Sequence, residues 1–162
     1  MRDLTPRTLR RGALCALLAA AGPACDSVIT VEDAAPRVTW VAARPLDAAT
    51  TELTVWVSDV EGDAVDLEVV WVDGAGAETP IAEWPGSQGT IGLTTREALF
   101  DPAGQPHRIL WDTTAISGQG RLRFSPDDRP HDDARGAGEV VETPSFDVAT
   151  GLAEPSEVVP AP

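Results

Sequence analysis

Apolar and polar residues alternate with a period of two in several short segments of the chain. The alternation is clearest at residues 53–58 (LTVWVS), 67–71 (LEVVW) and 121–124 (RLRF). Residues i and i+2 lie on the same face of a β-strand, so this period predicts strands that are buried on one side. No segment keeps a helical period over several turns, which favours an all-β domain.

Further strands and frequent turns extend this pattern. Residues 107–111 (HRILW) read as another strand, residues 37–42 and 145–148 as an outer pair, and residues 90–94 as a weaker strand. Residues 96–100 could form one helical turn. Clusters rich in Gly, Pro and Asp separate the segments, at 61–63, 72–74, 85–86, 101–104 and 118–120. About seven short strands with such turns predict an antiparallel β-sandwich over residues 37–148.

The first 24 residues have the order of a secretory signal. Four arginines in the first eleven residues precede an uncharged apolar run, residues 12–21 (GALCALLAAA), and small residues follow. Basic, apolar and small-residue regions in this order are typical of an export signal. A helix needs about 20 apolar residues to cross a bilayer, and this run is much shorter. We therefore predict a signal helix over residues 1–24.

A cysteine stands directly after this segment. Gly22, Pro23 and Ala24 precede Cys25, and this arrangement resembles that of bacterial lipoproteins. In that family the Cys thiol is acylated and the Cys becomes the mature N-terminus. Ala24 matches the family pattern, whereas Gly22 stands where the family prefers a Leu-type residue. An ordinary signal peptidase also cleaves after small residues, so a secreted, unlipidated product is the alternative.

The cysteine count agrees with use of this thiol. The chain has two Cys, and Cys15 lies inside the predicted signal. The mature chain would therefore keep Cys25 alone and hold no disulfide, although exported proteins meet oxidising surroundings. Acylation would account for a single unpaired Cys in an exported protein.

Two segments flank the predicted domain. Residues 25–36 (CDSVITVEDAAP) read as a flexible tether, which spans at most about 40 Å at roughly 3.3 Å per residue. Residues 149–162 (ATGLAEPSEVVPAP) are rich in Pro, Ala and Glu, and we predict a disordered tail there. The roughly 110 residues between them suffice to bury a core.

The charge balance excludes some partners. The chain has 26 acidic residues against 12 basic ones, all of them Arg, for a formal charge of −14. Without residues 1–24 the balance falls to 25 acidic against eight basic residues, a charge of −17. Nucleic-acid binding needs a basic surface, and anionic lipid heads repel an acidic one. We therefore expect no nucleic-acid partner, and membrane attachment only through an N-terminal lipid.

Three segments carry a resemblance to a fold family. Residues 57–65 (VSDVEGDAV) resemble the strand, acidic turn and strand that open bacterial Ig-like and fibronectin type III-like extracellular repeats. Residues 107–113 (HRILWDT) and 121–127 (RLRFSPD) resemble later strands of such repeats. The resemblance implies a non-catalytic scaffold for binding or surface display. The chain departs from antibody-type domains because it lacks their Cys pair, and without Tyr it has no tyrosine corner.

The Trp residues differ in whether they fall on the same side of a strand as the neighbouring apolar residues. Trp71 and Trp111 share parity with apolar neighbours, so we expect both in the core. Trp56 is out of phase with Leu53, Val55 and Val57. Trp56 therefore faces solvent or covers a sheet edge, where it either anchors an interface or packs beneath a loop.

One acidic turn is a candidate calcium site. Its carboxylates follow one another closely along the chain, and Gly62 would allow the chain to bend; they belong to Asp59, Glu61, Asp63 and Asp66. Ca²⁺ takes six to eight oxygen ligands, which such a turn could gather. The segment lacks the complete twelve-residue calcium-loop pattern, so a solvated acidic turn is the alternative. A calcium-dependent adhesion or structural domain is the corresponding function.

A second acidic cluster lies further along the chain and is a candidate contact loop. It contains Asp127, Asp128, His131, Asp132 and Asp133. His and carboxylates can bind zinc, but loops at the end of a sandwich more often carry recognition residues. We therefore predict contact with a protein partner here.

Catalytic motifs are absent from the sequence. It has no H-E-x-x-H, phosphate loop, dinucleotide fingerprint or G-x-S-x-G elbow. An envelope hydrolase would have to use His107 or His131. The sequence instead predicts an exported, lipid-anchored cell-envelope protein with a non-catalytic interaction module. It would need no cofactor other than Ca²⁺, and its partner would be an envelope protein or polysaccharide.

Overall fold

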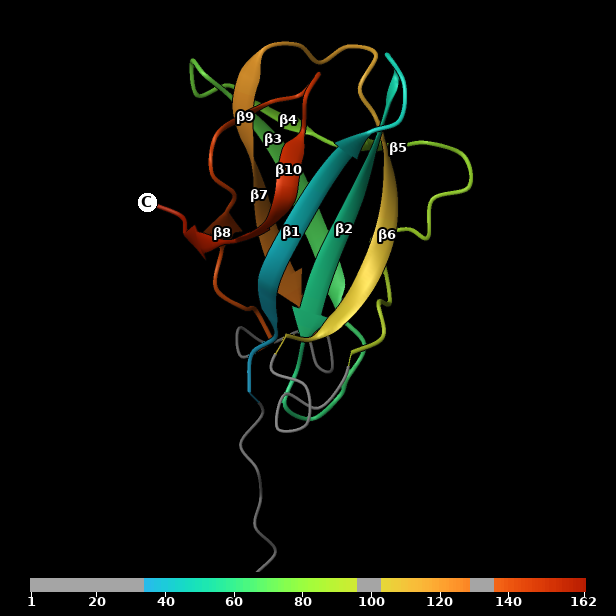
Figure 1. Ribbon diagram of the computed structural model, residues 1–162. Coiled ribbons are helices and arrows are strands. Elements are labelled where there is room, and N and C mark those ends of the chain that lie inside the picture. Colours follow the sequence, from blue (N-terminus) through green and yellow to red (C-terminus); the bar gives the residue numbers. More distant parts are fainter. Residues whose placement is uncertain (1–33, 96–102, 129–135) are drawn as a thin grey trace, which may run out of the picture. The chain divides into compact units, whose positions relative to one another are not determined.

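Two antiparallel β-sheets pack face to face in the computed structural model (Figure 1). The structure describes residues 34–95, 103–128 and 136–162, and these residues contain no helix. The predicted signal, Cys25, most of the tether and the possible helical turn at 96–100 lie outside the described residues. The all-β sandwich expected from the period-two pattern is confirmed.

The first sheet has five strands in the order β10-β1-β2-β6-β5. Every neighbouring pair in it is antiparallel. Its strands are β1 (Arg37–Pro45), β2 (Thr50–Ser58), β5 (Ala82–Glu83), β6 (Gln105–Asp112) and β10 (Leu152–Glu157).

The second sheet has the strand order β11-β8-β7-β3-β4, and β9 also pairs with β7. It too is antiparallel throughout. Its strands are β3 (Asp66–Asp73), β4 (Glu78–Pro80), β7 (Gln119–Asp127), β8 (Val141–Glu142), β9 (Phe146–Asp147) and β11 (Val159–Pro160).

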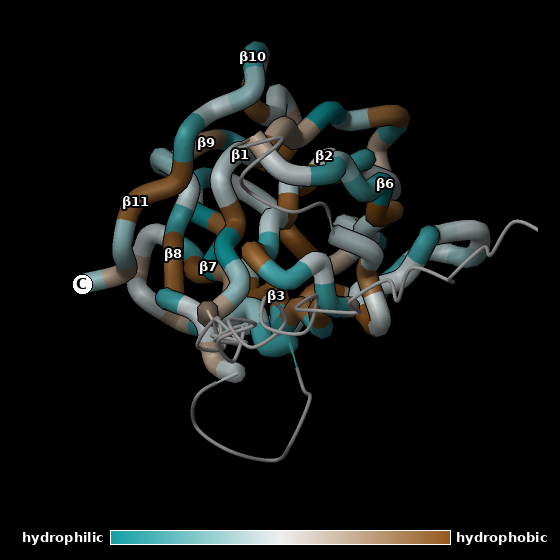
Figure 2. Tube along the Cα trace, turned by 90° about the horizontal axis from the view of Figure 1, so that it is seen from below, coloured by the Kyte–Doolittle hydropathy of each residue, from teal (hydrophilic) through white to brown (hydrophobic). Residues whose placement is uncertain are grey.

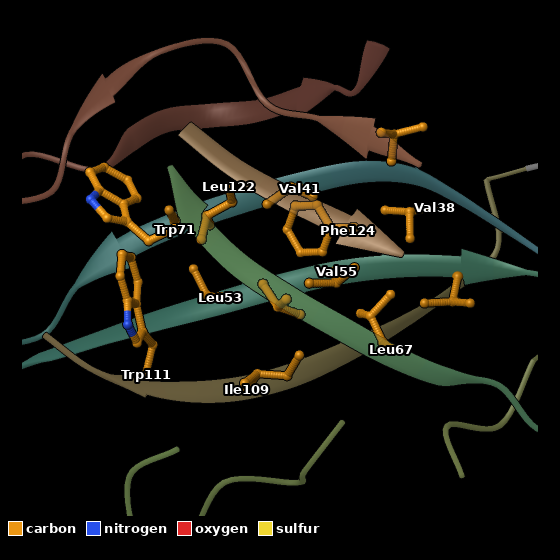
Figure 3. Close-up of a cluster of buried hydrophobic side chains, with 14 of the residues drawn as sticks. Val38, Val41, Leu53, Val55, Leu67, Trp71, Ile109, Trp111, Leu122 and Phe124 are labelled. Carbon is orange, nitrogen blue, oxygen red and sulfur yellow. The ribbon is translucent and has the colours of Figure 1, made fainter. Parts of the chain in front are cut away.

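Alternate residues of the long strands form the core between the sheets. Hydrophobic and hydrophilic positions alternate along the strands when the two layers are viewed end-on (Figure 2). Leu53, Val55 and Val57 of β2 are fully buried, as their period predicts. Figure 3 shows Trp71 and Trp111 close together at one end of this core. Their ring centroids are 5.4 Å apart, and both rings are buried, which confirms their predicted place.

The C-terminal segment belongs to the sandwich. The prediction of a disordered tail at residues 149–162 is wrong, because β10 pairs with β1 and β11 pairs with β8. Gly151 directly precedes β10 and has a φ of +70°, a conformation that suits glycine. A polar segment that contains Pro155 can still form an edge strand, because its other side needs no hydrogen-bond partner. The compact unit accordingly runs to Pro162.

Two other strand predictions need correction. Residues 37–42 and 145–148 are not paired with each other, because β1 lies between β10 and β2 while β9 pairs with β7. Residues 90–94 form no regular strand, and only Leu93 makes an isolated bridge, to Val65. The edge position next to β1 is instead taken by β10.

Candidate binding face

The outward side of the first sheet carries three rows of side chains from β1, β2 and β6. In each row the three residues lie opposite one another across the strands. The rows are Trp40, Trp56 and Pro106; Ala42, Thr54 and Arg108; and Arg44, Glu52 and Leu110. Leu110, at the β5 side of the last row, is buried with 9% of its surface exposed. In Figure 1 these three strands lie at the front, and no other described strand crosses them. These nine residues are called the binding face below.

A β-bulge sets the phase of β1 on this face. The register of β1 against β2 shifts between Val38 and Trp40. Val38 and Val41 are therefore both buried, while Trp40 points outward with 38% of its surface exposed. A bulge inserts one extra residue and reverses the side on which later side chains lie.

Trp56 lies in the middle of the sheet and is half-buried on its outer side. The sequence predicted that Trp56 either faces solvent or covers a sheet edge. In the structure it lies on the outer face of a central strand. Its cross-strand neighbours Trp40 and Pro106 make a continuous apolar row with it. Trp84 follows β5 and donates its backbone N–H to the Leu110 carbonyl, and it is 39% exposed. Trp40, Trp56 and Trp84 therefore lie outside the core between the two sheets.

Two arginines share one glutamate at the other end of the binding face. Arg44 Nη2 donates to Glu52 Oε1 at 2.9 Å, and Arg108 Nε donates to Glu52 Oε2. The arginine side chains are 69% and 55% exposed, whereas that of Glu52 is 14% exposed. The Arg108 hydrogen bond, aided by Arg44, outweighs the opposing effect of burial and lowers the pKa of Glu52 below its usual 4.5. Glu52 is therefore ionised at neutral pH and positions both guanidinium groups.

This ion pair predicts a pH-dependent stability. A carboxylate whose folded pKa is lowered stabilises the fold above its unfolded pKa, and that stability is lost as pH falls through the folded pKa. We expect Glu52→Gln to reduce stability at neutral pH by less than about 1 kcal/mol, because both partner arginines are exposed. The difference from wild type should vanish at pH values below the lowered pKa, measured by urea unfolding. Glu68→Gln, at an exposed site on β3, is the control; a difference for Glu52→Gln that persists at low pH would contradict the ion-pair explanation.

The acidic turn is held together by Asp59 itself. Asp59 is 2% exposed, and its Oδ1 accepts the backbone N–H groups of Glu61 at 2.8 Å, Gly62 at 2.8 Å and Asp63 at 3.2 Å. Asp66 Oδ1 accepts the Gly92 N–H at 2.7 Å. Nowhere in the described residues do three His, Cys, Asp or Glu side chains meet in a way that could hold a metal. Glu61 Oε2 also accepts the Ala34 N–H, at 3.4 Å. The structure thus does not gather the four predicted ligands into a metal cluster, and three of them serve as backbone acceptors.

Removing the Asp59 carboxylate should destabilise the domain. Asp59→Ala leaves three turn N–H groups without their acceptor, for an expected loss of about 1–3 kcal/mol. Asp59→Asn keeps an oxygen acceptor and should cost less. Thermal melting would measure both, and an equal loss in the two variants would contradict the acceptor role.

Calcium gives a second check on this turn. Asp59 Oδ2 is buried with no hydrogen-bond donor from the described part of the chain. The thermal melting of the wild type and of Asp59→Asn should therefore also be measured with millimolar Ca²⁺ and with chelator. We expect equal melting temperatures for the wild type. A rise with Ca²⁺ that Asp59→Asn abolishes would restore the calcium-dependent alternative.

The predicted contact loop is only partly described. Asp127 lies at the end of β7 and bridges to Ala137, while Asp128 donates its backbone N–H to Gly136. Asp128 is buried, with 5% of its surface exposed. His131, Asp132 and Asp133 lie outside the described residues.

His107 has a structural environment. It is 1% exposed; its Nε2 is 2.7 Å from the Thr94 carbonyl oxygen and its Nδ1 3.1 Å from Gln88 Nε2. The carbonyl can only accept, so Nε2 carries the proton and Nδ1 accepts from the Gln88 amide. Gln88 Oε1 in turn accepts the Arg108 N–H at 3.1 Å. Both ring nitrogens are used to fasten the segment after β5 to β6, so a hydrolase would have to rely on His131.

Two hollows lie at the ends of the sandwich. A groove of about 510 Å³ is lined by the loops after β1 and β6, with Leu46, Ile116 and Val148 among its apolar residues. A second hollow of about 610 Å³ is lined by residues near the start of β1 and the end of β2, including Asp59 and Glu139. The first is mainly apolar and holds no cluster of catalytic groups, so the binding face remains the richer candidate.

The binding face was mostly missed by sequence reasoning. The phase of Trp56 was the one available signal, because an aromatic residue stood among outward-facing positions. Trp40, Pro106 and the Arg44–Glu52–Arg108 cluster come from three strands, and only the strand register brings them together.

No protein-family model, curated protein or solved structure matches this chain. In the described part of the chain, no helix is long and apolar enough to cross a membrane.

Proposed function

We propose that the chain is an exported, lipid-anchored envelope protein whose Ig-like β-sandwich is a non-catalytic binding module. The observation that carries the binding role is the outward row of Trp40, Trp56 and Pro106 beside the Arg44–Glu52–Arg108 cluster. Exposed aromatic residues cost solvation energy and are enriched, with Arg, at the energetic centres of interfaces. The binding face supports recognition of a partner without chemistry.

The anchor rests on the N-terminal sequence. The basic and apolar order of residues 1–24, followed by Cys25, supports export and acylation at that thiol. A tether over residues 25–36 would let the domain stand up to about 40 Å from the lipid. A secreted protein with a free Cys25 is the alternative.

The anchor is tested by the intact mass of the chain in membrane and soluble fractions of its native host. We expect a membrane-bound chain that starts at Cys25 and carries acyl mass. Cys25→Ser should move the protein to the soluble fraction. Cys15→Ser, inside the predicted signal, is the matched control and should leave the acylated product unchanged. Recovery of an unmodified wild-type chain in the soluble fraction would reject the anchor.

The binding role is tested with the full chain carrying Cys25→Ser, recovered from the soluble fraction. This protein should sediment with isolated envelope fragments of the host. Trp40→Ala combined with Trp56→Ala should weaken sedimentation on the order of tenfold, as loss of interface anchors does. Ile91→Ala, which removes an exposed apolar side chain elsewhere, should have no effect. Equal sedimentation of the double Trp variant would reject the binding face.

A further inference from the structure

We infer that the binding face takes an uncharged polysaccharide, whose sugar rings stack on Trp40 and Trp56. This inference rests on the proposed binding role and names the class of partner. Three features of the face carry it: the geometry of the apolar row, the charge balance of the rows, and the supply of planar hydrogen-bonding groups.

The apolar row has the spacing that a chain of sugar rings needs. Trp40, Trp56 and Pro106 lie directly opposite one another on β1, β2 and β6. Neighbouring strands are about 4.8 Å apart, so the row spans roughly 10 Å across the sheet. The spacing of about 4.8 Å between neighbouring strands is comparable to the length of one sugar ring in a linear chain. A polysaccharide that crosses the strands could therefore place successive rings along the row.

The chemistry of the row fits one face of a sugar. Sugar rings present C–H groups on their flat faces, and these carry a small positive charge. The face of an indole ring carries the negative part of its quadrupole, so it attracts such groups. Trp40 is 38% exposed, so part of its side chain is open to solvent.

The charge balance of this surface favours an uncharged ligand. The rows contain Arg44 and Arg108 with Glu52, and the exposed Glu157 lies opposite Trp40 at the edge of the sheet. Among the nine residues of the binding face and Glu157, two basic and two acidic side chains balance, although the whole chain carries −14. An acidic polymer would meet long-range repulsion from the chain and no excess of positive charge at the site. A neutral ligand meets neither obstacle.

The ion-paired side chains supply hydrogen bonds for hydroxyl groups. Arg44 and Arg108 each have guanidinium N–H groups beyond the one that binds Glu52, and both side chains are largely exposed. Arg108 lies two residues along β6 from Pro106, which is about 7 Å. The shared carboxylate fixes both guanidinium groups beside the row, which lowers the entropy cost of binding.

The test is calorimetric titration of the full Cys25→Ser chain with neutral oligosaccharides of glucose, xylose, mannose and N-acetylglucosamine. The same protein is titrated with alginate and with polyglutamate. We expect binding to at least one neutral oligosaccharide, with little dependence on salt. Trp40→Ala combined with Trp56→Ala should weaken it on the order of tenfold, and Ile91→Ala should not. Unchanged thermal melting shows that each variant is folded.

Each other outcome has a defined meaning. Binding only to alginate or polyglutamate, weakened by salt, would overturn the inference of a neutral ligand. Binding to no polysaccharide, with Trp-dependent sedimentation on envelope fragments, would overturn it as well and leave the proposed binding role intact for a protein partner. Neutral-sugar binding that survives the double Trp substitution would reject this face as the site.

Discussion

Trp111→Ala should lower the stability of the domain by about 3–5 kcal/mol, which is a large part of the total for a domain of this size. The melting temperature should fall on the order of 10 °C or more. The indole is 1% exposed and is among the largest fully buried side chains of the core. Its removal therefore costs both the transfer energy of the ring and the energy of the cavity left behind.

The neighbours of Trp111 explain why this effect is large. Trp71 lies 5.4 Å from it between centroids, and Phe146 meets Trp71 edge-on at 5.3 Å. Such aromatic pairs add about 0.5–1.5 kcal/mol beyond the area they bury. Gly120 packs so closely that a Cβ there would lie 2.4 Å from a ring carbon of Trp71. Residues of β3, β6, β7 and β9 meet at this end of the core. Their close packing leaves the neighbours little freedom to fill a cavity at position 111.

Trp84→Ala is the matched control, because Trp84 is 39% exposed at the edge of the first sheet. It should change stability by no more than about 0.5 kcal/mol. Thermal melting and urea unfolding of both variants would measure the difference. Similar losses in Trp84→Ala and Trp111→Ala would contradict the assignment of the five Trp to core and surface.

The sequence predicted the inner faces of the strands well because burial on one side leaves a local pattern. Leu53, Val55 and Val57 carry that pattern within five residues, and all three are buried. Trp71 and Trp111 were placed in the core by the same reasoning. Period two is a property of a single strand, so it needs no knowledge of the neighbouring strands.

The binding face depends on pairing, which leaves no local signal. Without a bulge, Val38, Trp40 and Ala42 would share one face of β1. The shift between Val38 and Trp40 turns Trp40 outward, into the row of Trp56. Pro106 joins this row from a strand some fifty residues later in the chain. A sequence pattern can therefore predict a strand but cannot predict the register that assembles a site from three of them.

The acidic turn shows a different limit of sequence reasoning. Closely spaced carboxylates are equally suited to cations and to backbone N–H groups, because both need a negatively charged oxygen. In the structure Asp59 receives three N–H groups of its own turn, and Asp66 receives one from Gly92. Residue types gave the chemistry of the turn, but only the backbone path decides which donor reaches each oxygen.

Removal of residues 151–162 should destabilise the sandwich by about 3 kcal/mol or more and promote aggregation. The deletion removes β10 and β11, together with Leu152 and Val158, which pack against the core. It also leaves β1 as an unpaired edge, whose free N–H and C=O groups can pair with another chain. A disordered tail would be lost without consequence, so the deletion separates the two descriptions of this segment.

A point substitution tests the same contact without shortening the chain. Gly151 and Gly118 both have positive φ values, +70° and +79°. A Cβ at Gly151 would lie 2.1 Å from the Ala43 carbonyl oxygen of β1, whereas one at Gly118 would meet nothing within 4 Å. Alanine at either site adds strain of about 1–2 kcal/mol from the left-handed conformation. Only Gly151→Ala adds a clash with β1.

We therefore expect Gly151→Ala to cost clearly more than Gly118→Ala in urea unfolding, and to expose the amide groups of β1 to hydrogen exchange. The exchange measurement matters because β1 amides lose protection only if β10 separates from them. Equal costs in the two variants, with β1 still protected, would mean that the contact between Gly151 and β1 does not hold the C-terminal strand. Because Trp40 lies opposite Glu157 in this pairing, the same loss should also loosen the edge of the binding face.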